Sequence, residues 1–294
     1  MKLRKIILLS LIAVLLVVYI VQLASTGRGS VTPYSLSGEP DRIVIESAKN
    51  GKIVLTKTDD VWMLGENKQY DTLSSEVNIL VEALREYSVL QVVSKGGDEI
   101  LYGLDDDARI SVTAYQDDAV LCQYDVGKDA SSIRQSYIRR AGEKDILLIS
   151  DSWNSVFNVA MDDLRVRSVY SFAEDEITDA ALITKDAGVI MMSRDANGEW
   201  IGNYGQMTAE GIANWISSVS MLNAAGWLPD DWQPSAEAVG FITLKLADRV
   251  VTNTIYPVEG EDRYIGTSSE CPYAFYMSTY TKEKFLKTAD DFTE

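Results

Sequence analysis

Acidic side chains supply most of the candidate chemistry in this sequence of 294 residues. Three aspartates are consecutive at 105–107, and Asp195, Asn197 and Glu199 have the spacing with which calcium loops begin. Such a loop also needs an acidic residue at its twelfth position, which here is Gln206. Because Asp, Asn and Gly favour turns through local hydrogen bonds, we interpret both clusters as turns, with calcium binding as the alternative.

The sequence lacks the residues on which most other catalytic sites depend. The chain contains no histidine, which removes Ser-His-Asp and Cys-His catalysis and histidine-containing zinc sites. Two cysteines, Cys122 and Cys271, are too few for a metal site built from four thiolates, and we expect no disulfide between them. Glycine-rich phosphate-binding motifs are absent. A glycosidase with paired carboxylates remains an alternative, but nothing in the sequence brings two carboxyl groups together. We therefore predict a protein that is not an enzyme and has no cofactor or metal.

Tryptophans are the remaining candidates for a site. Trp62 and Trp200 each end a strand pattern, and the repetition of this position favours a core role beneath a helix over a ligand groove. Trp227 and Trp232 lie among prolines and acidic residues and are weak candidates for a partner contact, because aromatic residues are enriched at interface hot spots. Local packing is the alternative for this pair.

Two similar stretches, residues 43–90 and 177–222, organise the chain. Each has the pattern of strand, turn, strand, tryptophan and amphipathic helix, and Gly51 and Gly188 are 137 residues apart. This repetition indicates an internal duplication, with two unrelated α+β stretches as the alternative. Asn50-Gly51 predicts a type I′ hairpin turn. We expect Asp71 or Thr72 to cap the first helix and Thr208 the second. The predicted buried faces of the two helices are Val77, Leu80, Val81 and Leu84, and Ile212, Trp215, Ile216 and Val219.

Each copy continues with further predicted strands and a closing helix. In the first copy the strands are 89–93, 110–115, 120–126, 137–140 and 146–149, followed by a helix toward residue 164. In the second copy they are 241–246, 250–256, 264–265 and 274–277, followed by a helix at 281–288. The predicted fold class is α+β, with an N-terminal transmembrane helix and two tandem similar domains. Each domain is a mainly antiparallel sheet with a packed amphipathic helix, at residues 41–168 and 176–291.

The N-terminus has the pattern of a membrane anchor. Lys2, Arg4 and Lys5 precede residues 6–23, which carry no charge and are long enough to span a bilayer core of ~30 Å. The preceding positive charges predict a single-pass topology, with residues 1–5 in the cytoplasm, 24–40 as a tether and the domains outside. A cleaved signal peptide is the alternative, although the apolar run exceeds an ordinary signal core. The side chains expected to face lipid include Ile6, Leu9, Leu11, Val14, Leu16, Val18 and Leu23.

Charge excludes one class of partner. The net charge is −17, from 27 basic and 44 acidic residues. Residues 1–30 hold four basic and no acidic residues, so the predicted exported part carries 23 minus 44, or −21. Nucleic-acid binding needs a basic surface to neutralise phosphates, so we exclude it.

The stretch from Gly51 to Trp62, followed by Tyr102-Gly103-Leu104, resembles the family known as domain of unknown function 4340. Its members have one N-terminal transmembrane segment, a strand pair ending in Trp, an amphipathic helix and a Tyr-Gly-Leu motif usually followed by Pro. Here an aspartate, Asp106 or Asp107, stands where that proline would be. The family has no established activity, so the resemblance supplies no catalytic residues. Its members are often found beside ABC transporter subunits and gliding-motility-type auxiliary proteins, which implies an accessory subunit.

The combined expectation is a non-catalytic accessory protein of the bacterial cytoplasmic membrane, with its domains on the extracytoplasmic side. Its expected partners are the membrane, through the N-terminal helix, and a transporter permease or auxiliary subunit of an ABC-type or cell-envelope complex. The alternative is an envelope module that binds glycan or peptide, and an enzyme comes third.

Overall fold

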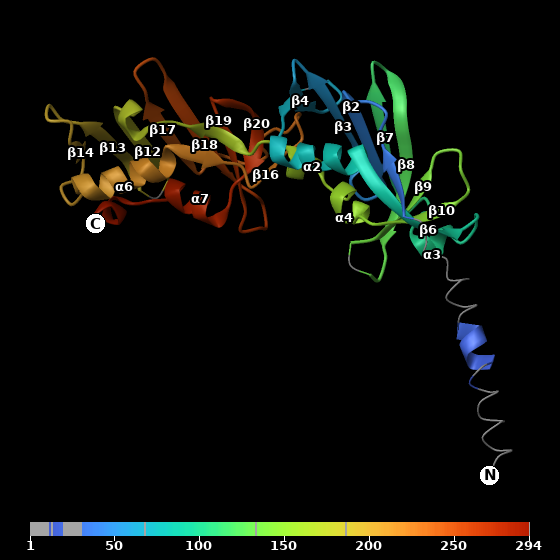
Figure 1. The fold of residues 1–294 in the computed structure, drawn as a ribbon. Coiled ribbons are helices and arrows are strands. Elements are labelled where there is room, and N and C mark those ends of the chain that lie inside the picture. The colour runs from blue at the N-terminus through green and yellow to red at the C-terminus, as the bar shows by residue number, and fades with distance from the viewer. Residues whose placement is uncertain are drawn as a thin grey trace, which may run out of the picture. The chain divides into compact units, whose positions relative to one another are not determined.

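The computed structural model describes residues 12, 14–19, 31–67, 69–132, 134–185 and 187–293 (Figure 1). It divides into two compact units, Met1–Val166 and Arg167–Glu294. Both units combine antiparallel strands with a few short helices, which confirms the predicted α+β class.

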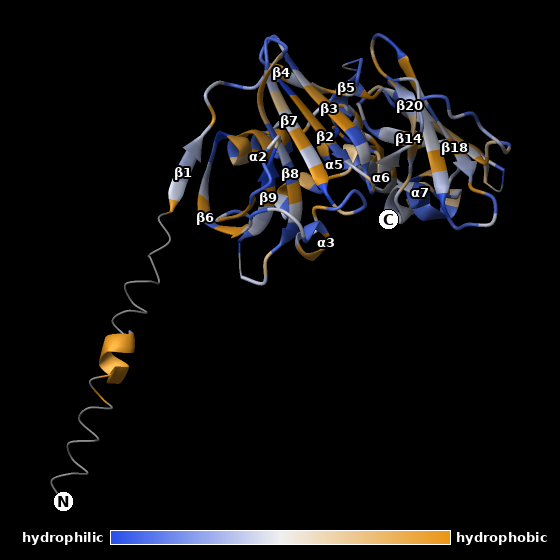
Figure 2. Ribbon diagram, turned by 90° about the vertical axis from the view of Figure 1, so that its right-hand side faces the viewer, coloured by the Kyte–Doolittle hydropathy of each residue, from blue (hydrophilic) through white to orange (hydrophobic). Residues whose placement is uncertain are grey.

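The first unit is built on one ten-stranded antiparallel sheet, with strand order β1-β6-β10-β9-β8-β7-β2-β3-β4-β5. Its strands are β1 (Thr32–Ser35), β2 (Arg42–Ser47), β3 (Gly51–Thr58), β4 (Val61–Leu64), β5 (Tyr70–Asp71), β6 (Glu86–Ser94), β7 (Ile110–Gln116), β8 (Ala119–Asp129), β9 (Ser136–Arg140) and β10 (Ile146–Ile149). Alternation along the strands separates two faces, and bands of apolar and polar residues follow one another along β7 and β3 (Figure 2).

Helices cover one face of this sheet and bury its apolar side chains. They are α2 (Ser74–Arg85), α4 (Trp153–Phe157) and α5 (Met161–Leu164), whereas none of the residues of the short α3 (Glu99–Tyr102) is buried. The predicted helix face is confirmed, because Val77, Leu80, Val81 and Leu84 are all buried. They join Ile43, Ile45, Ile53, Leu55, Tyr124, Ile138, Trp153 and Phe157 in the core. Each fully buried large apolar side chain contributes ~1.5–3 kcal/mol relative to an exposed one.

The second unit has an eight-stranded antiparallel sheet, with strand order β14-β13-β12-β17-β18-β19-β20-β16, and a separate pair β11-β15. The strands are β11 (Ser168–Ser171), β12 (Asp179–Thr184), β13 (Gly188–Arg194), β14 (Trp200–Gly202), β15 (Met221–Asn223), β16 (Gly226–Trp227), β17 (Gly240–Lys245), β18 (Val250–Pro257), β19 (Tyr264–Ser268) and β20 (Cys271–Tyr276). The helices are η1 (Glu174–Glu176), α6 (Ala209–Val219), α7 (Thr279–Phe285) and η2 (Ala289–Phe292). The predicted buried face of α6 is confirmed, and Thr208 caps this helix by accepting a hydrogen bond from the Gly211 amide.

The two sheets share one strand order. The run β4-β3-β2-β7-β8-β9-β10 in the first unit has the same sequence of neighbours as β14-β13-β12-β17-β18-β19-β20 in the second. The first turn is also alike, since the amide of Asn50 donates to the Ser47 hydroxyl and that of Ala187 to the Thr184 hydroxyl. The units differ where the long β6 of the first is replaced by the short β15 and β16.

The Asn50-Gly51 turn differs from the type I′ prediction. A type I′ turn needs positive φ at both central residues, but here only Gly51 has it, at 71°. The loop consists of residues 48–50 and is followed by the left-handed Gly51 at the start of β3, and the Asn50 amide donates to the Ser47 hydroxyl. Positive φ at two successive residues occurs instead in the Asp59-Asp60 and Asp117-Asp118 turns.

Two helix predictions for the first unit are also wrong. The residue that caps α2 is Leu73, which makes no side-chain cap, while Thr72 donates its hydroxyl proton to the Trp62 carbonyl. The predicted helix toward residue 164 is interrupted between α4 and α5. Asn158 ends α4 in a non-helical conformation, and Ala160 is extended, so the chain turns there and Leu164 packs separately.

The described part of the predicted anchor is residues 12 and 14–19, which are helical and apolar (Figure 2). The side chains of Val14, Leu16 and Val18 are exposed. The other expected lipid-facing residues lie outside the described residues: Ile6, Leu9, Leu11 and Leu23. Among the described residues, no helix has the length and apolar character needed to span a membrane.

Candidate functional site

The outer face of the first sheet, opposite the helices, carries the most prominent polar site. Every second residue of β2 and β3 points to this face because strand side chains alternate. The cross-strand pairs there are Arg42 with Thr56 and Glu46 with Lys52, with Val44 between them on β2. The strand β7 adds Thr113 and Tyr115 on the other side of β2.

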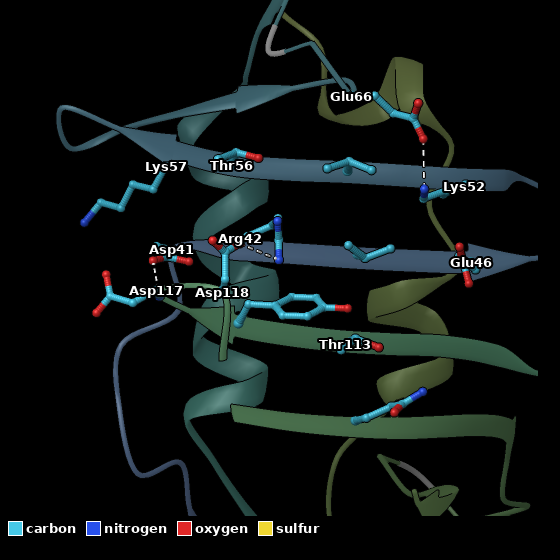
Figure 3. A pocket seen from close by; sticks show the side chains of 14 residues that line it. Asp41, Arg42, Glu46, Lys52, Thr56, Lys57, Glu66, Thr113, Asp117 and Asp118 are labelled. Carbon is cyan, nitrogen blue, oxygen red and sulfur yellow. Dashed lines mark hydrogen bonds and ion pairs between the residues drawn. The ribbon is translucent and has the colours of Figure 1, made fainter. Parts of the chain in front are cut away.

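These side chains line a groove of about 880 Å³ (Figure 3). We call this surface the first-sheet groove. It contains three basic and five acidic side chains, among hydroxyl, amide and two valine side chains. The lining residues are Asp41, Arg42, Val44, Glu46, Lys52, Val54, Thr56, Lys57, Glu66, Thr113, Tyr115, Asp117, Asp118 and Gln123.

Arg42 lies near one end of the groove. Its guanidinium is 3.1 Å from the Asp118 carboxylate and lies over the Tyr115 ring, 4.2 Å from the ring centroid. Its Nε is buried and has no hydrogen-bond partner among the described residues. A buried donor without a partner costs free energy, so this arrangement of Arg42 is held at some cost.

A second ion pair, between Lys52 and Glu66, lies at the other end of the groove. The Lys52 ammonium donates a hydrogen bond of 2.8 Å to Glu66 (Figure 3). This bond raises the pKa of Lys52 and lowers the pKa of Glu66, so both groups are charged at neutral pH. Because both side chains are exposed, the pair contributes little to stability and can exchange partners at low cost.

The arrangement suits non-covalent recognition of a charged surface. Neither cysteine lines the groove, and the carboxylates of Glu66 and Asp118 are each engaged by a cation. The backbone amide of Asp117 donates to the Asp41 carboxylate, which holds the β7–β8 turn beside the groove. Charged groups of both signs at fixed spacing provide orientation and specificity for a partner.

The acidic clusters form turns. The Asp195 carboxylate accepts hydrogen bonds from the backbone amides of Asn197 and Glu199, and the bond from Glu199 is the main cause of its lowered pKa. In the 105–107 run, Asp106 pairs with Arg109 at 3.0 Å. Within the described part of the chain, no group of three or more acidic or cysteine side chains is arranged to hold a metal ion.

The Tyr-Gly-Leu motif lies where α3 ends, next to strand β8 of the first sheet. Tyr102 ends α3, Gly103 has a φ of 68°, and Leu104 is buried. A Cβ on Gly103 would lie 2.9 Å from the Lys128 amide nitrogen, and one on Gly127 only 2.2 Å from the Tyr102 carbonyl oxygen. The two glycines therefore allow the backbone at the end of α3 to lie directly against the backbone of β8.

The tryptophans and cysteines are distributed between core and surface. The core role predicted for Trp62 and Trp200 is confirmed, because both are buried. Trp227 and Trp232 are half-buried, and their rings contact Phe275 and Tyr256 respectively, so both have local packing partners. Both cysteines are free; Cys122 is buried and Cys271 is half-buried.

The residues of the first-sheet groove were not predicted as a site. Their signal in the sequence is the polar residue at both ends of 42–46 and of 52–56, with one valine between them on the same face of each strand. Alternation shows that Arg42 and Glu46 share a face. It does not show that β7, some seventy residues later, lies beside them, because strand pairing across that distance has no local signal.

Comparison with known families identifies the class of protein to which the chain belongs. A model described as Domain of unknown function (DUF4340) matches residues 62–239. The match covers more than half of the 294 residues, so the chain belongs to this family, and the predicted resemblance is confirmed. It begins in β4 and includes parts of both units. No curated protein and no solved structure matches the chain significantly.

Proposed function

We propose that this protein is a non-catalytic, membrane-anchored accessory protein that binds a protein partner outside the cytoplasmic membrane through the first-sheet groove. The observation that carries the proposal is the groove itself, with its charges of both signs, among them the Arg42 guanidinium paired with Asp118.

The apolar N-terminal run supports membrane anchoring. Residues 6–23 carry no charge, and the described side chains from 14 to 19 are apolar and exposed. Water disfavours such a surface, whereas the hydrocarbon core of a bilayer accommodates it. The basic residues before the run favour a cytoplasmic N-terminus, which places both units on the extracytoplasmic side.

The edges of the first sheet favour recognition by its face. The edge strands are short, since β1 has four residues and β5 has two. Short edges offer few free backbone groups to an added strand, so a peptide has little to pair with there. A partner must instead contact side chains on the face, where the groove offers a hollow of about 880 Å³.

A glycan is a weaker candidate for the groove. Aromatic rings that bind sugars present an open face, but the Arg42 guanidinium covers the Tyr115 ring. A charged protein surface fits the ion pairs better, because it can exchange partners with Arg42, Lys52 and their carboxylates. The family resemblance favours a subunit of an ABC-type transport or cell-envelope complex as this partner, and the shared strand order of the two units supports an origin by duplication.

The test is recovery of the tagged full-length chain from its native membrane in mild detergent, with mass spectrometry of the proteins that accompany it. Arg42→Glu should lose the partner, because it reverses the charge at the groove. Arg85→Glu is the matched control, since Arg85 is an exposed, ion-paired arginine outside the groove.

Three outcomes refute parts of the proposal. Recovery without any stoichiometric partner contradicts the accessory role. Loss of the partner from both arginine variants alike contradicts the groove as its binding surface. Release of the chain from membranes by carbonate or high salt contradicts the anchor, because a spanning helix resists both treatments.

A further inference from the structure

The outer face of the second sheet is apolar and exposed. On this face the register places Val189 beside Ile183 and Ile183 beside Phe241, across β13, β12 and β17. Met191 follows on β13, and Ile201 lies on the edge strand β14. We call these residues, together with Val250 at the start of β18, the second-sheet patch. Their exposed fractions run from 37% for Phe241 to 57% for Met191.

The fold does not require apolar residues at these positions. The equivalent row of the first sheet is Lys52, Glu46 and Ser111, which the register pairs in the same way. One architecture therefore carries a charged face in the first unit and an apolar face in the second. Exposed apolar side chains that adjoin one another across several strands mark an interaction surface.

A depression adjoins part of the second-sheet patch, and Met191, Ile201 and Val250 belong to both. This depression of about 530 Å³ surrounds Ala181, with Met191 and Ile201 on its rim. Among the described residues, the charged ones that line it are Asp179 and Lys245, which pair with each other at 3.1 Å. A partner that covers this face would bury these two charges as a pair. The desolvation cost is therefore smaller than for an unpaired charge.

We propose that the second-sheet patch is the interface through which two copies of this chain form a symmetric dimer. A two-fold axis brings the same patch of both copies together, and a hollow rimmed by large side chains can receive the same side chains from a second copy. Sheets that pack face to face, about 10 Å apart, bury side chains of this kind.

The size of the patch fits a dimer interface. Six side chains that are about half exposed present roughly 500 Å² of apolar surface, taking ~170 Å² for a full side chain of this size. A standard interface buries ~800 Å² on each partner, and ~65% of a homodimer interface is apolar, or ~520 Å². The patch is therefore of the order of size that such an interface needs.

Charge favours a second copy over a partner attracted by charge. The chain has a net charge of −17, so two copies repel each other overall, but the depression beside the second-sheet patch adds no unpaired charge to this repulsion. Salt screens repulsion between like charges. The dimer should therefore become tighter as salt rises, whereas binding to an oppositely charged partner would weaken.

The test is sedimentation velocity of the full-length chain in detergent over a range of concentrations and salt. We expect a reversible dimer with a Kd at or below ~10 µM that tightens between ~50 and ~300 mM salt. Met191→Glu should weaken the dimer at least ~30-fold, because the charge is introduced twice at the centre of the interface. Val61→Glu is the matched control, since Val61 has the same exposed fraction of 57% but lies in the first unit.

The outcomes are distinguishable. A chain that stays monomeric at ~100 µM overturns the proposal, since no specific dimer of this interface size would be that weak. A dimer that survives Met191→Glu overturns it as well, and assigns association to the N-terminal helix or to another face. Equal weakening by Val61→Glu would overturn it too, because it would show a general effect of charge. Unchanged circular dichroism and unfolding midpoints of the variants verify that the fold is retained.

Discussion

Replacing Gly103 by alanine tests whether the Tyr-Gly-Leu motif holds α3 against β8. Gly103 has a left-handed φ of 68°, which costs an alanine ~1–2 kcal/mol. The new methyl would also lie 2.9 Å from the Lys128 nitrogen, so the backbone must shift, at a further ~1–3 kcal/mol. We expect Gly103→Ala to destabilise the first unit by about 2–5 kcal/mol.

Gly142→Ala separates the two contributions. Gly142 has a similar φ of 77°, but nothing lies within 4 Å of the position that its Cβ would take. Only the conformational cost of ~1–2 kcal/mol applies there.

Urea unfolding followed by hydrogen exchange and mass spectrometry reports each unit separately. With a urea dependence of ~2 kcal/mol per molar, the midpoint of the first unit should fall by ~1–2.5 M in Gly103→Ala and by ~0.5–1 M in Gly142→Ala. The midpoint of the second unit should stay the same in both variants. Equal losses in the two variants would refute the packing role that we assign to the motif.

Three further predictions concern a buried thiol, an ion pair and a helix cap. Burial raises the pKa of Cys122 to about 11, above that of an unfolded thiol, so the unfolding free energy should fall by about 3 kcal/mol as pH rises from ~8.5 through 11. Cys122→Ala should remove this part of the alkaline loss in urea titrations. Arg139→Ala should destabilise the first unit by about 2 kcal/mol in the same assay, because it removes a 2.8 Å bond to the half-buried Asp125. Thr208→Ala should cost the second unit about 1 kcal/mol, because it removes the cap on the Gly211 amide.

A different result would contradict each of these three predictions. If the unfolding free energy falls equally with rising pH in the original chain and in Cys122→Ala, the thiol is not the source of the loss. That result would contradict the prediction that Cys122 loses its proton in the unfolded state but keeps it in the folded state. Arg139→Ala should cost more than Arg249→Ala, whose ion pairs are more exposed, and the reverse order would contradict the role of burial. A Thr208 variant that lowers the midpoint of the first unit would contradict the independence of the two units.

Local patterns predicted the elements of this fold well. The helical spacing from Val77 to Leu84 and the alternation in β7 and β8 both arise because one face of the segment packs on the core. The pattern of apolar residues within the segment is therefore enough to predict its secondary structure. The Thr208 cap was predictable for the same reason, since a hydroxyl next to the first helical turn satisfies a free amide.

The failures lie where a distant segment decides the local conformation. The first residues of α2 are held by the Leu164 carbonyl, which accepts a hydrogen bond from the Leu73 amide, so a side-chain cap from Asp71 or Thr72 is not needed. Asn50 adopts no left-handed conformation because the Ser47 hydroxyl stabilises a three-residue loop instead. The groove depends on the pairing of β2 with β7, which no pattern within either strand specifies.

The pairing at the centre of each sheet determines when the unit can complete its folding. Ile43 on β2 pairs with Ala114 on β7, 71 residues later, and Leu182 on β12 pairs with Ile242 on β17, 60 residues later. Hairpins such as β2–β3 can form at once, but the centre requires closure of a long loop, which is entropically slow. We therefore expect each unit to fold in milliseconds to seconds. As the chain emerges from its N-terminus, the backbone edge of β2 stays unpaired until β7 has followed.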